Sequence, residues 1–122
     1  MARNSLSLGS LEAKIMHVVW QEGDVFLSVR DVLGRLDEDL AYTTVMTVMN
    51  RLYEKGLLRR RRDGRAWLYR PAMTREAFAA ATMSEVLSTA SDRRAALLHF
   101  VADLSGEDTD ALRRLLGRRK ST

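Results

Sequence analysis

A long amphipathic run ends at a glycine and leads directly into a hairpin pattern, and this succession most constrains the fold. Within residues 41–56 the apolar side chains recur at helical spacing, as Val45, Val48, Met49 and Leu52. Gly56, preceded by Lys55, is typical of a helix end. We therefore predict a helix over residues 41–56 whose apolar stripe faces a core.

Two runs of strand length follow this helix, residues 57–62 and 66–70. They are joined through Asp63-Gly64, a dipeptide favoured in tight turns. The sequence thus predicts a β-hairpin with arginines at its tip. Because successive side chains of a strand alternate between faces, only about half of the run Arg59–Arg62 can point toward one partner.

The residues before this unit predict two further helices and a brief strand. Helical spacing indicates a helix over residues 8–22, capped by Ser7 or Ser10, and a short second helix capped by Ser28. The apolar residues 25–27 predict a brief strand between them. Helix, strand, helix, helix and hairpin is the order of a winged helix-turn-helix, so we expect a mainly α fold with a small β-hairpin wing.

After Pro71 the composition changes to short helical segments rich in alanine and leucine, at residues 74–90, 92–104 and 107–117. These segments are too short to form a sizeable core of their own, so they should pack on the first domain or on a second copy. We predict a winged-helix DNA-binding domain over residues 1–73 and a helical dimerisation domain over residues 74–122.

Positive charge is concentrated in the predicted hairpin and the end of the helix before it. Residues 51–70 contain 8 basic and 2 acidic residues, a net charge of +6, whereas residues 1–50 have a net charge of −3. A local basic block attracts a polyanion such as nucleic acid. The alternative is an arginine-rich hairpin that is merely solvated.

The outward face of the predicted helix suits DNA recognition, because it carries short hydroxyl and amide groups. Thr44 and Thr47, one turn apart, can meet adjacent base edges, and Asn50 can reach an adenine. Either threonine can instead bond back to its own turn, and Tyr42 can pack rather than contact a phosphate. We predict DNA contacts from Tyr42, Thr43, Thr44, Thr47, Asn50, Arg51, Lys55, Arg62 and Arg65, with the basic residues on phosphates.

Few residues are suited to catalysis or metal binding. There is no cysteine, and His17 and His99 lie far apart without a ligand spacing. We expect no enzyme activity, no cofactor and no metal. No apolar run approaches the length of a membrane span and the chain has no apolar leader, so we expect a cytoplasmic protein with no membrane partner.

Three motifs in order resemble the penicillinase-repressor family of the BlaI/MecI/CopY type. The helix motif is Thr44-x-x-Thr47-x-x-x-Arg51-Leu52-x-x-Lys55-Gly56. Upstream stands Leu11-Glu12-x-x-Ile15-Met16-x-x-Val19-Trp20, and Ala66-x-x-Tyr69 with Pro71 fits the end of the wing. The resemblance implies a homodimeric repressor that binds double-stranded, pseudo-palindromic operator DNA.

The resemblance also implies a route of regulation. The antibiotic-responsive branch of the family is inactivated by a regulatory protease that cuts before a phenylalanine, in a segment similar to residues 98–101 here. That places a cleavage between His99 and Phe100, although His99 stands where the family usually has asparagine. The alternative is that Phe100 is a dimer-core aromatic. The copper-responsive branch is disfavoured because its C-terminal cysteine motif is absent.

Two other functions stay open on the sequence alone. One is a non-specific architectural DNA-binding protein, in which the winged helix contributes only electrostatic attraction to DNA. The other is a one-component regulator whose C-terminal helices hold a small effector.

Overall fold

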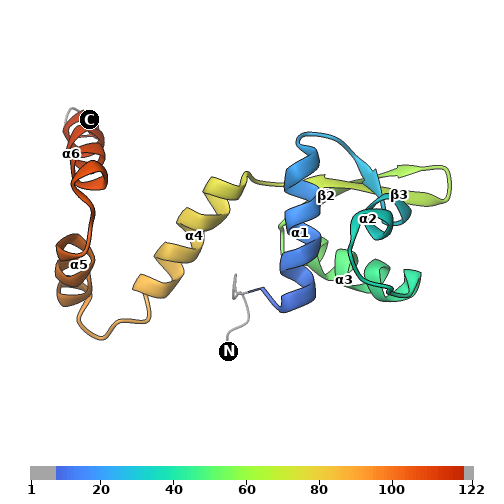
Figure 1. Cartoon of the computed structure of the whole chain (residues 1–122), viewed down its shortest axis with the longest axis horizontal. Coiled ribbons are helices and arrows are strands. Elements are labelled where there is room, and N and C mark those ends of the chain that lie inside the picture. The colour runs from blue at the N-terminus through green and yellow to red at the C-terminus, as the bar shows by residue number, and fades with distance from the viewer. Residues whose placement is uncertain (1–7, 120–122) are drawn as a thin grey trace. The chain divides into compact units, whose positions relative to one another are not determined.

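The computed structural model describes residues 8–119 and confirms a mainly α fold with a small antiparallel sheet (Figure 1). The elements in chain order are α1 (Ser10–Glu22), β1 (Leu27–Ser28), α2 (Val29–Arg35), α3 (Tyr42–Glu54), β2 (Leu58–Asp63), β3 (Ala66–Pro71), α4 (Arg75–Leu87), α5 (Arg93–Ala102) and α6 (Gly106–Arg119).

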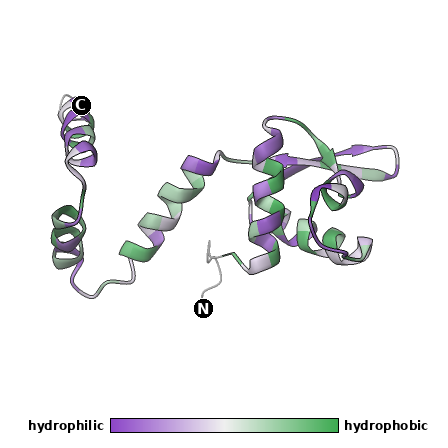
Figure 2. Cartoon of the chain, in the orientation of Figure 1, coloured by the Kyte–Doolittle hydropathy of each residue, from purple (hydrophilic) through white to green (hydrophobic). Residues whose placement is uncertain are grey.

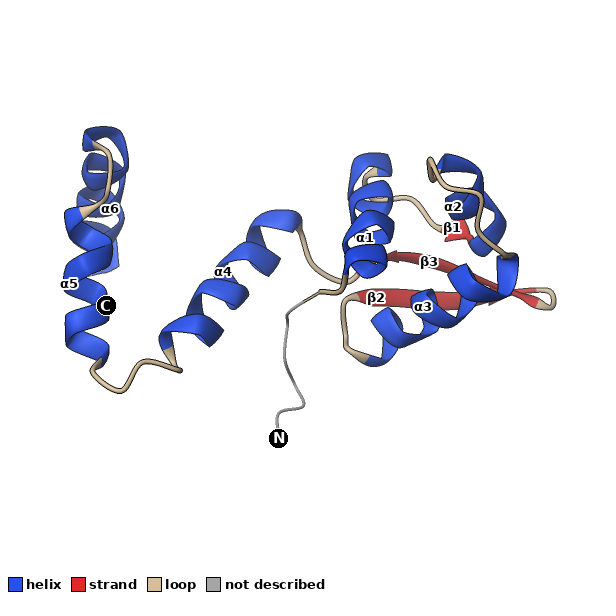
Figure 3. Cartoon of the chain, turned by 60° about the horizontal axis from the view of Figure 1, so that its bottom comes forward, coloured by secondary structure: helices blue, strands red, loops and turns tan. Residues whose placement is uncertain are grey.

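The three strands form the wing and its attachment to the helices. Their order is β1-β3-β2, with both pairings antiparallel, and α3 packs against β2 of the hairpin (Figure 3). Tyr69 in the central strand pairs with Leu27 on one side and with Arg60 on the other. The predicted winged helix-turn-helix is therefore confirmed, with β1 tying the start of α2 to the sheet.

The core of this unit lies between the three N-terminal helices and the sheet. The predicted stripe of α3 is buried in full, and Met49 and Leu52 are among the residues with no exposed surface. The remaining buried apolar residues are Ile15, Met16, Val18, Val19, Leu27, Val29, Val32, Leu57, Leu58 and Tyr69. Met46 and Met83, by contrast, are exposed.

Three local expectations need correction. Gly9, not a serine, caps α1: Ser10 is the first helical residue, and Ser7 lies outside the described residues. The brief strand starts at Leu27 rather than at residue 25, because only Leu27 and Ser28 pair with β3. The hairpin turn is Gly64-Arg65, one residue later than expected, because Asp63 still pairs with Ala66.

Side chains cap the starts of α2 and α4, and the first of these two caps was predicted correctly. Ser28 caps α2: its hydroxyl accepts from the Asp31 N–H, and its own N–H donates to the Asp31 carboxylate, both at 3.0 Å. That donation from the Ser28 backbone lowers the pKa of Asp31. Thr74 caps α4 by accepting a hydrogen bond from the Ala77 N–H at 3.0 Å.

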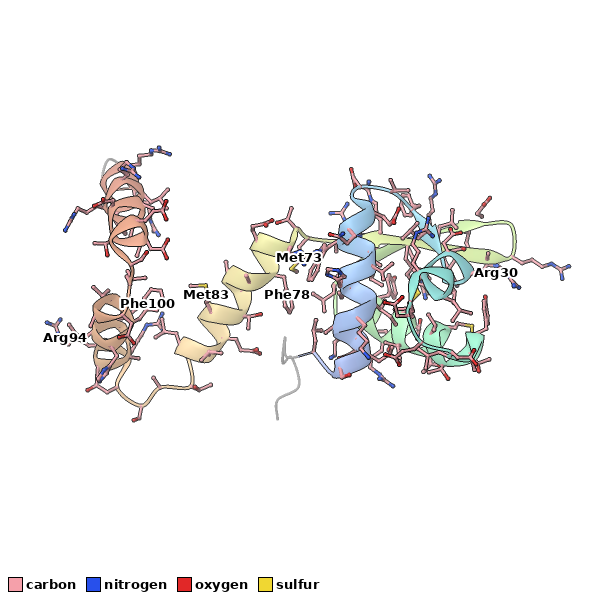
Figure 4. All side chains as sticks on the ribbon, in the orientation of Figure 1. Arg30, Met73, Phe78, Met83, Arg94 and Phe100 are labelled. Carbon is pink, nitrogen blue, oxygen red and sulfur yellow. The ribbon has the colours of Figure 1, made fainter. Side chains whose placement is uncertain are left out.

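The described chain divides into two compact units after Met83, within α4. The first turns of α4 belong to the first unit: Phe78 packs on Trp20 with ring centroids 5.5 Å apart, and the Trp20 indole N–H donates to the Met73 carbonyl at 3.0 Å (Figure 4). The second unit contains α5 and α6, and neither helix buries a residue. Among the described residues, no helix is both long and apolar enough to cross a membrane.

Truncating the buried side of α3 should destabilise the first unit. Leu52→Ala removes a side chain with no exposed surface, so we expect a loss of about 2–5 kcal/mol in the free energy of unfolding. Urea denaturation followed by circular dichroism measures this loss. Glu54→Ala, at an exposed position of the same helix, is the control and should change stability by no more than about 0.5 kcal/mol. Equal effects of the two substitutions would contradict the packing described.

Candidate nucleic-acid interface

The outward side of α3 presents the predicted recognition residues to solvent. Tyr42, Thr43, Thr44, Thr47 and Arg51 are all exposed. Thr43, Thr47 and Asn50 follow one another at spacings of four and three residues, so they form one line along the helix. This line lies opposite the buried stripe that includes Val45 and Leu52. Short polar groups thus occupy the part of α3 that is farthest from the core.

Asn50 differs from the threonines, because it is half-buried and already has a partner. Its amide oxygen Oδ1 accepts a hydrogen bond from Arg60 Nη1 at 2.8 Å. The structure therefore joins a predicted base reader of α3 to the middle of strand β2. Contact between Asn50 and adenine stays a prediction, but one of the two lone pairs of the amide oxygen is already occupied by Arg60.

Arg30 extends the exposed surface beyond α3, and the sequence interpretation did not include it. Its guanidinium carbon lies 5.6 Å from the centre of the Tyr42 ring, where the start of α3 meets α2 (Figure 4). Both side chains are exposed. An arginine two residues after a capping serine gives no sequence signal of its own, so only the packing of α2 beside α3 reveals this cation.

The wing separates its arginines between two faces, as strand alternation requires. Arg60 and Arg62 lie on the face that carries Trp67, with guanidinium carbons 4.1 and 4.9 Å from that ring. Arg61 lies on the opposite face, over Phe26 at 4.3 Å. Arg65 is exposed in the hairpin loop, where Gly64 has a φ of 64°, the positive value that this tight turn requires. Arg62 and Arg65 are therefore both available at the tip.

Lys55, predicted to contact a phosphate, has an acidic partner within the protein. Its Nζ lies 3.0 Å from Oε1 of Glu12, a buried residue of α1. Burial raises the pKa of Glu12, but hydrogen bonds from the Gly9 N–H and from Lys55 outweigh it, so the pKa is lowered overall. Lys55 therefore ties the end of α3 to the start of α1, and a phosphate contact from it stays a prediction.

Metal ligands are not assembled anywhere in the described part of the chain. Residues 8–119 contain no cluster of three or more histidine or acidic side chains that could hold a metal ion. His17 lies in α1, with Nδ1 3.4 Å from Arg75 Nη1, and His99 lies in α5. The geometry of the first unit is thus that of a polar helix face beside a basic hairpin.

Comparison with known proteins identifies the family of this chain. The family model described as penicillinase repressor matches residues 8–118, which is nearly the whole chain. The chain belongs to the penicillinase-repressor family. Two curated relatives, each named transcriptional regulator BlaI, come from strains CDC 1551 / Oshkosh and ATCC 25618 / H37Rv of Mycobacterium tuberculosis. Each is 43% identical over 114 residues, covering 89% of this chain and 82% of the relative.

Solved structures confirm the fold. The DNA-binding domain of the repressor BlaI, solved in solution, superposes with a TM-score of 0.50 at 23% identity, covering 62% of this chain and 90% of that one. A ferric uptake regulator from Francisella tularensis gives a TM-score of 0.51 at 19% identity, covering 60% of this chain and 58% of that one. At these identities the likeness shows the fold alone.

Family membership confirms the general function predicted from the sequence. Penicillinase repressors are DNA-binding transcriptional regulators and not enzymes, so the chain is a DNA-binding repressor of this family.

The Glu12–Lys55 pair makes stability depend on pH. Because folding lowers the pKa of Glu12 below its ordinary value of about 4.5, the pair stabilises the fold above that pH and ceases to do so as the pH falls through the lowered pKa. Glu12→Gln should therefore reduce the free energy of unfolding more at pH 7 than at pH 3. Urea titrations at both pH values measure this difference. Glu54→Gln, at an exposed position, should show the same small effect at both; a Glu12→Gln deficit independent of pH would refute the electrostatic role.

Proposed function

We propose that this chain is a homodimeric repressor that reads pseudo-palindromic operators through α3 and grips the DNA backbone through its wing. The observation that supports it best is the pairing of an exposed line of short polar side chains on α3 with a basic hairpin beside it. A major groove admits one helix, and a hairpin next to that helix meets the flanking phosphates. The neutral hydroxyls read bases, while arginines fix the register.

In this proposal each predicted contact residue has one role. Thr44 and Thr47 meet base edges, and Asn50 lies at the edge of the same surface. Tyr42 and Thr43, at the start of α3, face the DNA backbone. The remaining contacts are cations that bind phosphates: Arg51, Lys55, Arg62 and Arg65. Lys55 does so only at the cost of its pairing with Glu12.

The second unit supports dimerisation through exposed apolar side chains. Leu98 and Val101 of α5 are 60% and 54% exposed, and Leu116 of α6 is 61% exposed. Figure 2 shows α5 as mostly hydrophobic. Such side chains are stabilised by burial, and a second copy of the same helices offers a matching surface. Two copies place two recognition helices on one DNA, which is why we propose an operator with two-fold symmetry.

We also propose that proteolysis between His99 and Phe100 releases the DNA. Both residues are exposed within α5 (Figure 4 labels Phe100). Cleavage there would disconnect Phe100, Val101 and the whole of α6 from the DNA-binding unit, and so remove apolar surface that the dimer needs. Because the bond lies inside a helix, α5 must unwind locally before a protease can bind it in extended form.

The experiment that tests the proposed function is selection of bound fragments from genomic DNA at physiological salt, where non-specific contacts are weak. Recovery of a few sites with two-fold symmetry is expected. Diffuse recovery without a common motif would contradict it and favour the non-specific architectural alternative.

Thr47→Ala should weaken binding to the selected operator by about 1–3 kcal/mol and leave binding to random DNA nearly unchanged, because the substitution removes a base contact only. Fluorescence anisotropy with both DNAs over a range of salt concentrations measures this. Arg65→Ala is the contrasting variant: it should weaken binding to both DNAs and reduce the salt slope by about one. Equal losses of Thr47→Ala on both DNAs would remove Thr47 from the base readers.

Leu116→Asp should shift the protein from dimer to monomer. In a symmetric interface the side chain is lost twice, so the dimer should weaken by at least about 3 kcal/mol. Analytical ultracentrifugation measures the shift, and binding to the full operator should fall with it. Arg114→Asp, two residues away and hence on another side of α6, is the control. A dimer unaffected by Leu116→Asp would exclude this face from the interface.

A further inference from the structure

Arg60 is the most constrained cation of the wing. It lies in the middle of β2, opposite Tyr69, on the sheet face that turns toward α3. Its guanidinium carbon is 3.9 Å from the centre of the Tyr53 ring and 4.1 Å from the centre of the Trp67 ring. The aromatic partners come from α3 and from β3, so Arg60 links the recognition helix to both strands of the wing.

This packing restricts the directions in which Arg60 can donate hydrogen bonds. Two aromatic rings centred about 4 Å from the guanidinium carbon leave fewer directions open to its N–H donors. In one of these directions Nη1 donates to Asn50 Oδ1 at 2.8 Å. Arg60 is also half-buried, and its Nε is fully buried without a hydrogen-bond partner. Asn50 Oδ1 is therefore the acceptor that the structure provides for this guanidinium.

The contact with Arg60 also determines the orientation of the Asn50 side-chain amide. A guanidinium has donors and no acceptor, so only the oxygen of the amide can face it. The Nδ2 amino group of Asn50 is consequently directed away from Arg60. An asparagine reads adenine by accepting from N6 and donating to N7 at once, which requires both ends of the amide.

We propose that Arg60 is a positioning residue that holds Asn50 as a hydrogen-bond donor toward DNA. Asn50 then favours a base whose major-groove edge carries acceptors without an amino group, guanine or thymine, over adenine or cytosine. This inference rests on the proposed operator binding, and it replaces the adenine contact expected from the sequence. It makes a residue that touches no base a determinant of base preference.

The test is selection from a randomised DNA library with four proteins: the wild type, Asn50→Ala, Arg60→Lys and Thr47→Ala. Asn50→Ala identifies the base pair that Asn50 reads, as the position where preference is lost. The wild type should prefer guanine or thymine there by about two- to tenfold, the effect of one hydrogen bond. Arg60→Lys keeps the charge but replaces the planar group packed against two rings with an ammonium on a flexible stem, which is not held at Asn50 Oδ1. This variant should therefore lose the preference or shift it toward adenine. Preference at the base pair identified by Thr47→Ala should stay unchanged in Arg60→Lys.

A second variant covers the case in which Arg60→Lys does not fold. Asn50→Asp retains an acceptor for Arg60 but has no amino group, so the wing should stay in place, with unchanged tryptophan fluorescence, while the preference for guanine or thymine is lost. Circular dichroism confirms the folding of each variant.

Several results would overturn the proposal while leaving operator binding intact. They are a wild-type preference for adenine or cytosine at the Asn50 position, a motif unaffected by Asn50→Ala, and a folded Arg60→Lys with the wild-type preference. Absence of any motif for the wild type would instead overturn the proposed function, and this inference with it.

Discussion

The two-sided character of α3 is the constraint on which the rest of the first unit depends. Val45, Val48, Met49 and Leu52 must be covered, and α1, α2 and the sheet cover them. Burial of that stripe leaves the opposite side of the helix in solvent, where Thr43 and Thr47 precede the charged Arg51 and Glu54. The same thirteen residues thus form the buried stripe and the exposed face that we propose reads DNA, so a shift of the helix about its axis would move both.

Periodicity and turn chemistry made most of the fold predictable. The stripe of α3, the Ser28 cap and the hairpin after Gly56 are local patterns, and each was correctly predicted. The errors were also local. A glycine with a glutamate three residues later replaced the expected serine cap, and the hairpin turn moved by one residue because the pairing of Asp63 with Ala66 extends the strands.

What the sequence could not show is how residues far apart in the chain become partners. Lys55 pairs with Glu12, 43 residues away, and Arg60 reaches back ten residues to Asn50. Arg30 joins the exposed surface only because α2 packs beside α3. A list of basic residues read from the sequence therefore treats every cation as equally available to DNA. Tertiary packing is what separates the structural cations from the exposed ones.

That separation has a consequence for the ions released when the protein binds DNA. Residues 51–70 carry eight cationic side chains, but Lys55 and Arg70 face carboxylates, and Arg60 is half-buried against two rings. The other five are exposed, so at most five of the eight can displace condensed counterions from the phosphates without giving up an acidic partner or a half-buried position. The entropy gained from that displacement is set by the exposed cations, so the formal charge of the segment overstates it.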